Sequence, residues 1–171
     1  MGTKRVGMAR VRSLINENTN QLKLNRQKQI TLVHNVTTNH TLGADASGAT
    51  LLWEHGSAHD ITLPSAKAGM TLKFILKVGS AHAQNLVSQS ADKIYGKVIV
   101  HRSDAADKTS LQTVARGSAV DKVKLNKTTT TLGGDIGDVI ELHCYEDGYW
   151  TCHASLSVSG GNPGSTAVLA N

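Results

Sequence analysis

The strongest constraint on the fold of this 171-residue chain is a period of two in its apolar residues. Over residues 71–78 an apolar side chain stands at every second position, and only Ile75 breaks the alternation. Successive side chains of a strand point to opposite faces, so this pattern predicts a strand with one buried face and one face in water. A stripe with helical spacing is absent from this part of the chain.

Similar short runs recur through the chain, separated by turn clusters such as GADASG, PSAKAG and GGDIGD. They predict nine strands, at residues 29–36, 49–54, 59–63, 71–78, 93–100, 109–115, 120–125, 138–145 and 149–158. Many short strands at regular spacing are typical of an all-β protein. We therefore predict a single antiparallel β-sandwich, or a jelly-roll or barrel-like domain, over residues 29–158. Trp53 and Trp150 fall in apolar strands, where a place in the core is expected rather than a sugar-binding platform formed with the tyrosines.

The last predicted hairpin carries both cysteines of the chain, Cys144 and Cys152. Opposed residues of two antiparallel strands must point to the same side. A three-residue loop, Glu146-Asp147-Gly148, satisfies this by placing Cys144 opposite Trp150. Cys152 then lies diagonally from Cys144 at roughly 7–8 Å, too far for an unstrained disulfide. We predict two buried, reduced thiols, whereas a loop shifted by one residue would allow a disulfide.

The basic residues are concentrated in an N-terminal segment, residues 1–28, which we call the basic arm. It holds seven of the 18 basic residues of the chain and one of its 13 acidic residues: Lys4, Arg5, Arg10, Arg12, Lys23, Arg26 and Lys28, against Glu17. Charge runs of this kind are usually interaction tails that seek an acidic partner, although a solvated leader is the alternative. No aromatic side chains are interleaved with them, so nucleic acid is not the expected partner.

Within the basic arm, apolar residues recur at helical spacing. The stripe consists of Val11, Leu14, Ile15 and Leu22, with Asn18 also on it. It predicts a short amphipathic helix over residues 9–24 that orders only against a partner or in a trimeric bundle. At the other end, residues 159–171 are rich in glycine and are expected to form a flexible tail.

Several groups of residues have the chemistry of a metal or histidine site but lack the geometry that such a site needs. His143 and Cys144, with Cys152 and His153, resemble a zinc ligand set, but neighbouring strand residues face opposite sides and cannot converge. Asp135, Asp138 and Glu141 lack the spacing of a calcium loop. The phrase Gly-Ser-Ala-His occurs twice, ending at His59 and His82. We expect these histidines in surface loops, with a symmetric histidine ring as the alternative.

The sequence contains no phosphate-binding loop, no nucleophile elbow and no paired carboxylates. We therefore expect a protein that is not an enzyme and needs no cofactor or metal. No run approaches the roughly 18 apolar residues of a membrane helix, and no apolar run follows the basic start as in a signal peptide. The alternative to a protein without enzymatic activity is a carbohydrate-active β-sandwich enzyme.

Three phrases resemble the small β-structured virion proteins of tailed bacteriophages, chiefly capsid decoration (cement) proteins and fibre knobs. They are HDITLPSAKAGMTLKFIL, a DKIYG strand and GDVIELHCYEDGYW, with a Leu-Pro-x-Ala-x-x-Gly turn at residues 63–69. The resemblance covers residues 40–158 and lies in the rhythm of strands and turns.

This resemblance implies a homotrimer on the outer capsid surface of a virion, assembled in the host cytoplasm. Its partner would be the major capsid protein. On the charge argument, and not from the resemblance, we expect the basic arm to spread over an acidic lattice. We also expect Thr-rich edges such as residues 128–131 to be covered by neighbouring subunits. The alternative within the same group is a tail or head fibre component with a receptor-binding β-tip, for which residues 9–24 would start a stalk.

Overall fold

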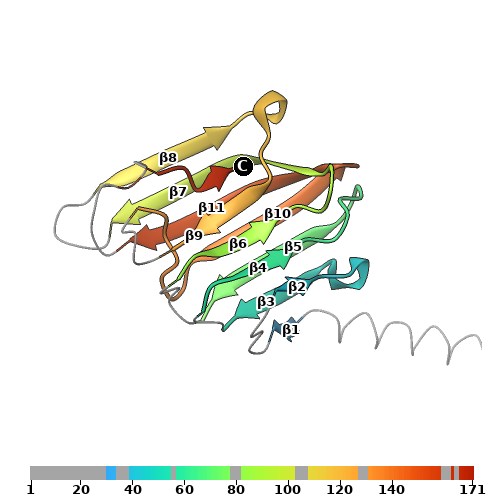
Figure 1. Cartoon of the computed structure of the whole chain (residues 1–171), viewed down its shortest axis with the longest axis horizontal. Coiled ribbons are helices and arrows are strands. Elements are labelled where there is room, and N and C mark those ends of the chain that lie inside the picture. The colour runs from blue at the N-terminus through green and yellow to red at the C-terminus, as the bar shows by residue number, and fades with distance from the viewer. Residues whose placement is uncertain are drawn as a thin grey trace, which may run out of the picture.

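The computed structural model describes residues 39–54, 57–77, 82–102, 108–126, 131–158, 163 and 166–171, together with the backbone of residues 30–33. These residues form an all-β fold of two mixed sheets packed face to face (Figure 1). The large sheet has seven strands, in the order β1 (Ile30–Val33), β3 (Ala49–Trp53), β5 (Thr71–Leu76), β10 (Val139–Glu146), β11 (Tyr149–Val158), β7 (Lys93–Arg102) and β8 (Thr109–Val114). The small sheet has five, in the order β12 (Leu169–Ala170), β9 (Lys122–Leu125), β6 (Gln84–Val87), β4 (His59–Thr62) and β2 (His40–Thr41). Two short 3-10 helices, η1 (Ala44–Ala46) and η2 (Arg116–Ser118), lie in connections.

The first six strands alternate between the two sheets. β1, β3 and β5 pair in parallel in the large sheet, while β2, β4 and β6 pair in parallel in the small one. The chain therefore winds as successive coils, each visiting both sheets. The two histidines of the Gly-Ser-Ala-His phrases stand at related positions, since His59 begins β4 and His82 shortly precedes β6.

The last six strands complete the two sheets, mostly by antiparallel pairing. β10 and β11 form a hairpin that pairs with β5 on one side and, through β11, with β7 on the other. β7 pairs antiparallel with β8, and β9 pairs antiparallel with β6 and β12. Among the described strand pairings, the five between β1 and β3, β3 and β5, β2 and β4, β4 and β6, and β7 and β11 are parallel. The prediction of an antiparallel sandwich is thus wrong in strand direction, because alternation marks a half-buried strand and not the direction of its neighbour.

Both sheets contribute to one apolar core between them. Trp53, Phe74 and Trp150 are among its largest fully buried side chains, and the small sheet adds Ile61 and Leu86. The predicted core positions of the two tryptophans are confirmed. Burial of the alternate residues in β5 and β7 follows the period of two in the sequence.

His59 differs from the prediction of a surface loop. It begins β4 and is only 5% exposed, whereas His82 is exposed. The indole Nε1 of Trp53 donates a hydrogen bond to Nε2 of His59 at 3.0 Å, and Nδ1 of His59 lies 3.0 Å from the carbonyl oxygen of Ser57. A donor directed at Nε2 requires that nitrogen to be unprotonated, so the buried ring carries its proton on Nδ1, where Ser57 accepts it.

Gly96 permits the close parallel approach of β7 to β11. Its φ is +139°, and a Cβ built there would lie 2.1 Å from the carbonyl oxygen of Cys152. No side chain fits in that space. The glycine in the DKIYG phrase therefore has a packing role inside the sheet and does not mark a turn.

The β10–β11 hairpin also differs in detail from the prediction. Glu146 pairs with Tyr149, so the loop is Asp147-Gly148, and the register shifts between His143 and Glu146. This bulge, rather than a longer loop, keeps the buried residues of both strands on one side. Cys152 pairs with Leu142, which places it diagonally from Cys144, and both cysteines are free and buried.

Asp147 and Asp92 hold the turn that precedes β5 against this hairpin loop. The backbone N–H of Ala66 donates to Asp92 at 2.7 Å, and that of Ala68 donates to Asp147 at 3.0 Å. Gly148 in turn donates its N–H to the carbonyl of Ala66 at 3.0 Å. The Leu-Pro-x-Ala-x-x-Gly turn and the Asp-Gly loop are thus one connected end of the molecule.

The chain after residue 158 differs from the predicted flexible tail in its last residues. Leu169 and Ala170 form β12 on β9, and Val168 is fully buried. The side-chain amide of Gln112 in β8 donates to the carbonyl of Thr166 at 2.8 Å and accepts from the N–H of Val168 at 2.7 Å. This amide fastens the C-terminal end of the small sheet to the large one. The basic arm lies outside the described residues.

Candidate functional site

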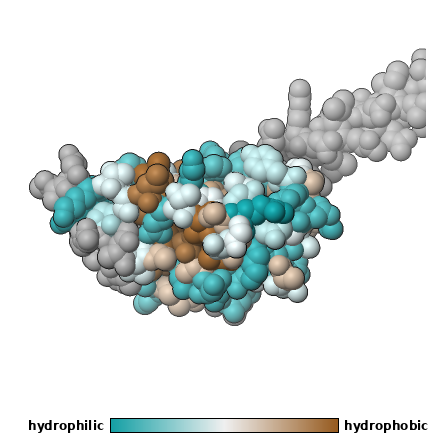
Figure 2. All heavy atoms as spheres, turned by 90° about the horizontal axis from the view of Figure 1, so that it is seen from above, coloured by the Kyte–Doolittle hydropathy of each residue, from teal (hydrophilic) through white to brown (hydrophobic). Residues whose placement is uncertain are grey.

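The outer face of the large sheet, the side turned away from the small sheet, carries a row of five apolar side chains and one serine, Ser155. The strand registers place one residue from each of six strands side by side: Leu52, Ile75, Val139, Ser155, Ile99 and Leu111. We call this set the apolar row. Ile99 is 38% exposed and Leu111 61% exposed. The row is therefore open to solvent at its β8 end. Figure 2 views the molecule from the side of β8 and shows hydrophobic residues among polar ones.

A shallow hollow of about 350 Å³ lies over the row at β7, β8, β10 and β11. Its lining comprises Lys97, Ile99, Leu111, Val139, Glu141, His153, Ala154 and Ser155. The floor is apolar, while two opposite charges and an imidazole stand at the rim. This combination suits a surface that docks against another macromolecule better than one that encloses a small ligand.

A polar row runs beside the apolar row, two residues along each strand. It consists of Thr50, Lys73, Glu141, His153, Lys97 and Thr113. The ammonium of Lys73 donates to the carboxylate of Glu141 at 2.8 Å, with both side chains 41% exposed. This hydrogen bond is the main cause of a lowered pKa for Glu141. The carboxylate therefore stays charged beside the row over a wider range of pH.

Aromatic side chains gather on the same outer face at the end that carries the Asp147-Gly148 loop. All three tyrosines of the chain lie there. The rings of Tyr95 and Tyr149 meet edge to face at 6.3 Å, and His143 stacks on Tyr145 at 6.0 Å and approaches His153 at 6.2 Å. Tyr145 is 69% exposed. We call these five residues the aromatic cluster.

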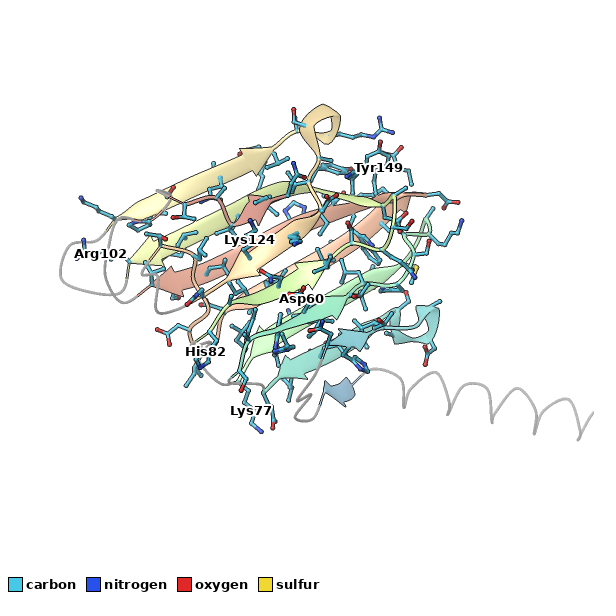
Figure 3. The ribbon with its side chains drawn as sticks, viewed as in Figure 1. Asp60, Lys77, His82, Arg102, Lys124 and Tyr149 are labelled. Carbon is cyan, nitrogen blue, oxygen red and sulfur yellow. The ribbon has the colours of Figure 1, made fainter. Side chains whose placement is uncertain are left out.

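Arg116, from η2, closes one side of the aromatic cluster. Its guanidinium lies over the ring of Tyr149, 4.5 Å from the centroid, and forms a two-point ion pair with Glu146. Arginine fixed between a carboxylate and an aromatic face loses little further freedom on binding a partner. Figure 3 shows Tyr149 at this end of β11.

The outer face of the small sheet is different in kind. Asp60, Asn85 and Lys124 stand side by side across β4, β6 and β9, and Asn85 donates to Asp60 at 2.6 Å. The next row consists of Thr62, Val87 and Lys122, with a single apolar member. Asp60 and Lys124 are labelled on this sheet in Figure 3. Of the two outer faces, the one on the large sheet is thus the candidate for docking.

The structure separates the groups that the sequence places close together. His143 and His153 lie on the outer face of the large sheet, whereas Cys144 and Cys152 are buried between the sheets. Burial raises the pKa of the Cys152 thiol to about 12 and is also the main cause of a raised pKa for Cys144. A thiol with so high a pKa is a poor nucleophile and a poor metal ligand.

The acidic residues considered for calcium do not form one site. Asp138 is 2% exposed and accepts the backbone N–H groups of Gly134 and Asp135 at 2.8 and 3.0 Å. Burial is the main cause of its raised pKa. Glu141 is paired with Lys73 on the outer face. Within the described part of the chain, no group of three or more histidine, cysteine or acidic side chains converges on a metal-sized space.

The sequence-predicted binding residues lie outside the described structure. This holds for the basic residues and the apolar stripe of the basic arm, and for residues 128–130 of the Thr-rich segment. Thr131 is described and donates its hydroxyl to that of Thr166 at 3.0 Å. None of the helices described is long and apolar enough to span a membrane.

Neither the apolar row nor the aromatic cluster was predicted. The outward residues Ile75, Ile99 and Leu111 are visible as breaks in the alternation or as apolar residues at polar positions. Only the order and register of the strands, however, bring them into one line.

Comparison with known proteins adds no relative, since the chain matches no protein-family model, no curated protein and no solved structure.

Proposed function

We propose that this chain is a structural virion protein, a capsid decoration protein that binds and stabilises the head lattice of a tailed phage. The observation that carries the proposal is the apolar row on the outer face of the large sheet. Six adjacent strands at about 4.8 Å spacing make a stripe roughly 24 Å long. A mostly apolar stripe of this extent, interrupted by Ser155 and edged by polar residues, is typical of protein interaction sites.

The proposed mode of binding uses two parts of the chain. The apolar row excludes water against the capsid surface, with Lys73, Glu141 and Lys97 at its rim to fix the orientation. The basic arm adds electrostatic attraction to an acidic lattice, through residues such as Arg10 and Arg12. Binding that favours the assembled lattice stabilises it by mass action. The protein then resides on the outside of the virion, and the homotrimer implied by the resemblance is one way to match a local three-fold position.

The test is co-sedimentation of the full chain with mature heads, stripped of decoration, from the phage that encodes it. Val139→Lys places a charge in the apolar row, and Val87→Lys makes the same change on the outer face of the small sheet. We expect Val139→Lys to weaken head binding at least tenfold and Val87→Lys to leave it unchanged. Equal binding by both variants overturns the role of the row, and no binding by the unmodified chain overturns the function.

The basic arm is tested separately by deleting residues 1–24. We expect the truncated chain to lose head binding while circular dichroism shows an unchanged β-domain. Retention of binding at full affinity would show that the arm has no part in it.

A second function, receptor binding by a fibre tip, is favoured by the aromatic cluster. The exposed ring of Tyr145, beside two half-buried tyrosines, an arginine and two histidines, forms a surface suited to stacking on sugar rings. The measurement is binding of the chain to lipopolysaccharide and capsular oligosaccharides, with Tyr145→Ala as the variant and Tyr145→Phe as its control. Saccharide binding that Tyr145→Ala removes, together with no binding to heads, would favour the fibre function over decoration.

A further inference from the structure

The free edge of the large sheet at β8 is built differently from the edges of the small sheet. β2 and β12, at the two edges of the small sheet, have two residues each. β8 has six, Thr109–Val114, with no charge and no proline among them, and Leu111 at its centre is 61% exposed. Short strands, charges and prolines are the usual protections of an edge against pairing with another chain. β8 has none of the three, and Figure 1 shows it at the margin of the large sheet.

The hydrogen-bond pattern fixes which backbone groups of β8 face outward. The N–H of Arg102 donates to the carbonyl of Lys108 at 2.8 Å, so Lys108 belongs to a hydrogen-bonded pair with β7. Hydrogen-bonded and non-hydrogen-bonded pairs alternate along an antiparallel ladder. The N–H and C=O groups of Ser110 and Gln112 therefore also point to β7, and those of Thr109, Leu111 and Thr113 point away from it. Among the described backbone hydrogen bonds outside the ladders, none involves these three outward residues.

The outward residues are complementary to a second copy of themselves. In an antiparallel pair centred on Leu111, Leu111 lies opposite Leu111 of the other copy, and Thr109 lies opposite Thr113. All three are hydrogen-bonded pairs, which gives six backbone hydrogen bonds. Opposed threonines and opposed apolar residues are favourable cross-strand pairs. Lys108 faces Val114, so no like charges meet along residues 108–114.

We propose that β8 pairs with β8 of a second copy of this chain about a two-fold axis at Leu111. The two large sheets then form one continuous sheet. Because Leu111 is also the last member of the apolar row, the rows of the two copies join end to end into one stripe of twice the length. The amide of Gln112 supports this arrangement from the inner side, since its bonds to Thr166 and Val168 hold β8 in the plane of the sheet. The pairing does not depend on the function proposed above, and it predicts a two-chain assembly in place of the homotrimer that the resemblance implies.

The first test is the mass of the full chain by light scattering over a dilution series. We expect a two-chain species at high concentration that dissociates on dilution. Leu111→Lys sets two ammonium groups opposite each other and should weaken the association at least tenfold, to a single-chain mass. Ile136→Lys is the matched control, because Ile136 is 67% exposed in a turn away from β8, and should keep the two-chain mass. Circular dichroism verifies that both variants fold.

The second test fixes the register. Under mild oxidation Leu111→Cys should form a disulfide-linked dimer, because opposed residues in such a pair lie about 5.5 Å apart between Cα atoms. Thr109→Cys alone should give no dimer, since Thr109 of one copy faces Thr113 of the other, whereas a mixture of Thr109→Cys and Thr113→Cys should. A mass of one chain or of three chains at all concentrations, or crosslinking of Thr109→Cys with itself, would overturn the proposal.

Discussion

The two faces of the large sheet are formed by the same strands but differ in how far their side chains are exposed to solvent. On the inner face Trp53, Phe74 and Trp150 are at most 1% exposed, packed against the small sheet. On the outer face Leu111 and Tyr145 are more than 60% exposed. Substitutions on the inner face should therefore change the free energy of unfolding, whereas those on the outer face should change binding.

Gly96→Ala should have the largest effect. A methyl group at this position meets the backbone of Cys152 at 2.1 Å, and the φ of +139° is itself unfavourable for alanine. We expect a loss of about 3–5 kcal/mol in the free energy of unfolding, measured by urea titration. Gly117→Ala is the control, because a Cβ there has no atom within 4 Å, and should change stability by less than about 0.5 kcal/mol. Equal effects would contradict the close approach of β7 to β11.

Trp53→Phe should have an intermediate effect. It removes buried ring volume and leaves Nε2 of His59 without the indole donor. We expect a loss of about 1–3 kcal/mol by urea titration. Tyr145→Phe on the outer face should change stability by less than about 0.5 kcal/mol, since the tyrosine is 69% exposed.

Cys152→Ser should lower the free energy of unfolding by about 1–2 kcal/mol, because a hydroxyl replaces a thiol at a fully buried site. Thiol reactivity gives an independent measurement of the same burial. With the pKa of Cys152 raised to about 12, its thiolate is negligible at neutral pH. We expect an aromatic disulfide reagent to label no thiols in the folded protein and two after denaturation. Rapid labelling in the folded state would place the cysteines outside the core.

Glu141→Gln should have the smallest effect, below about 0.5 kcal/mol, because the ion pair with Lys73 is 41% exposed on both sides. Its pKa is lowered from 4.5, so the stabilisation is present above that value and is lost as the pH falls through the lowered pKa. Asp138, on the inner side, has a pKa raised from 3.8. The stabilisation of the folded state by its protonated form is therefore complete below pH 3.8 and is lost as the pH rises through the raised pKa. Carboxyl NMR titration should show the two pKa values shifted in opposite directions; shifts of the same sign would contradict the assigned environments.

The sequence predicted the strands more accurately than their arrangement. Alternation located β5 and β11 and the core positions of Trp53 and Trp150, because burial of alternate residues acts within one strand. It missed β6, where only Leu86 and Val87 are apolar, and the two-residue strands β2 and β12. Parallel pairing and the bulge at the β10–β11 loop depend on contacts between distant segments, which no local pattern encodes.

The candidate site was less predictable than the fold. From the sequence we predicted the basic arm as the binding segment, whereas the candidate binding surfaces in the described residues are the apolar row and the aromatic cluster. Tyr95 and Tyr149 are far apart in the chain, and their contact depends on the parallel pairing of β7 with β11. His59 was misplaced for a similar reason, since its burial depends on the Trp53 indole of the preceding strand.

The coil arrangement of the first six strands has a consequence for the order of folding. Residues paired there are close in sequence, as Thr50 with Lys73, and the β10–β11 hairpin is more local still. The join between these units, in which Lys73 meets Glu141, spans 68 residues. Longer loops cost more entropy to close, and non-local pairing slows folding. The coils and the hairpin should therefore form first, with the junction of β5 and β10 made in the rate-limiting step.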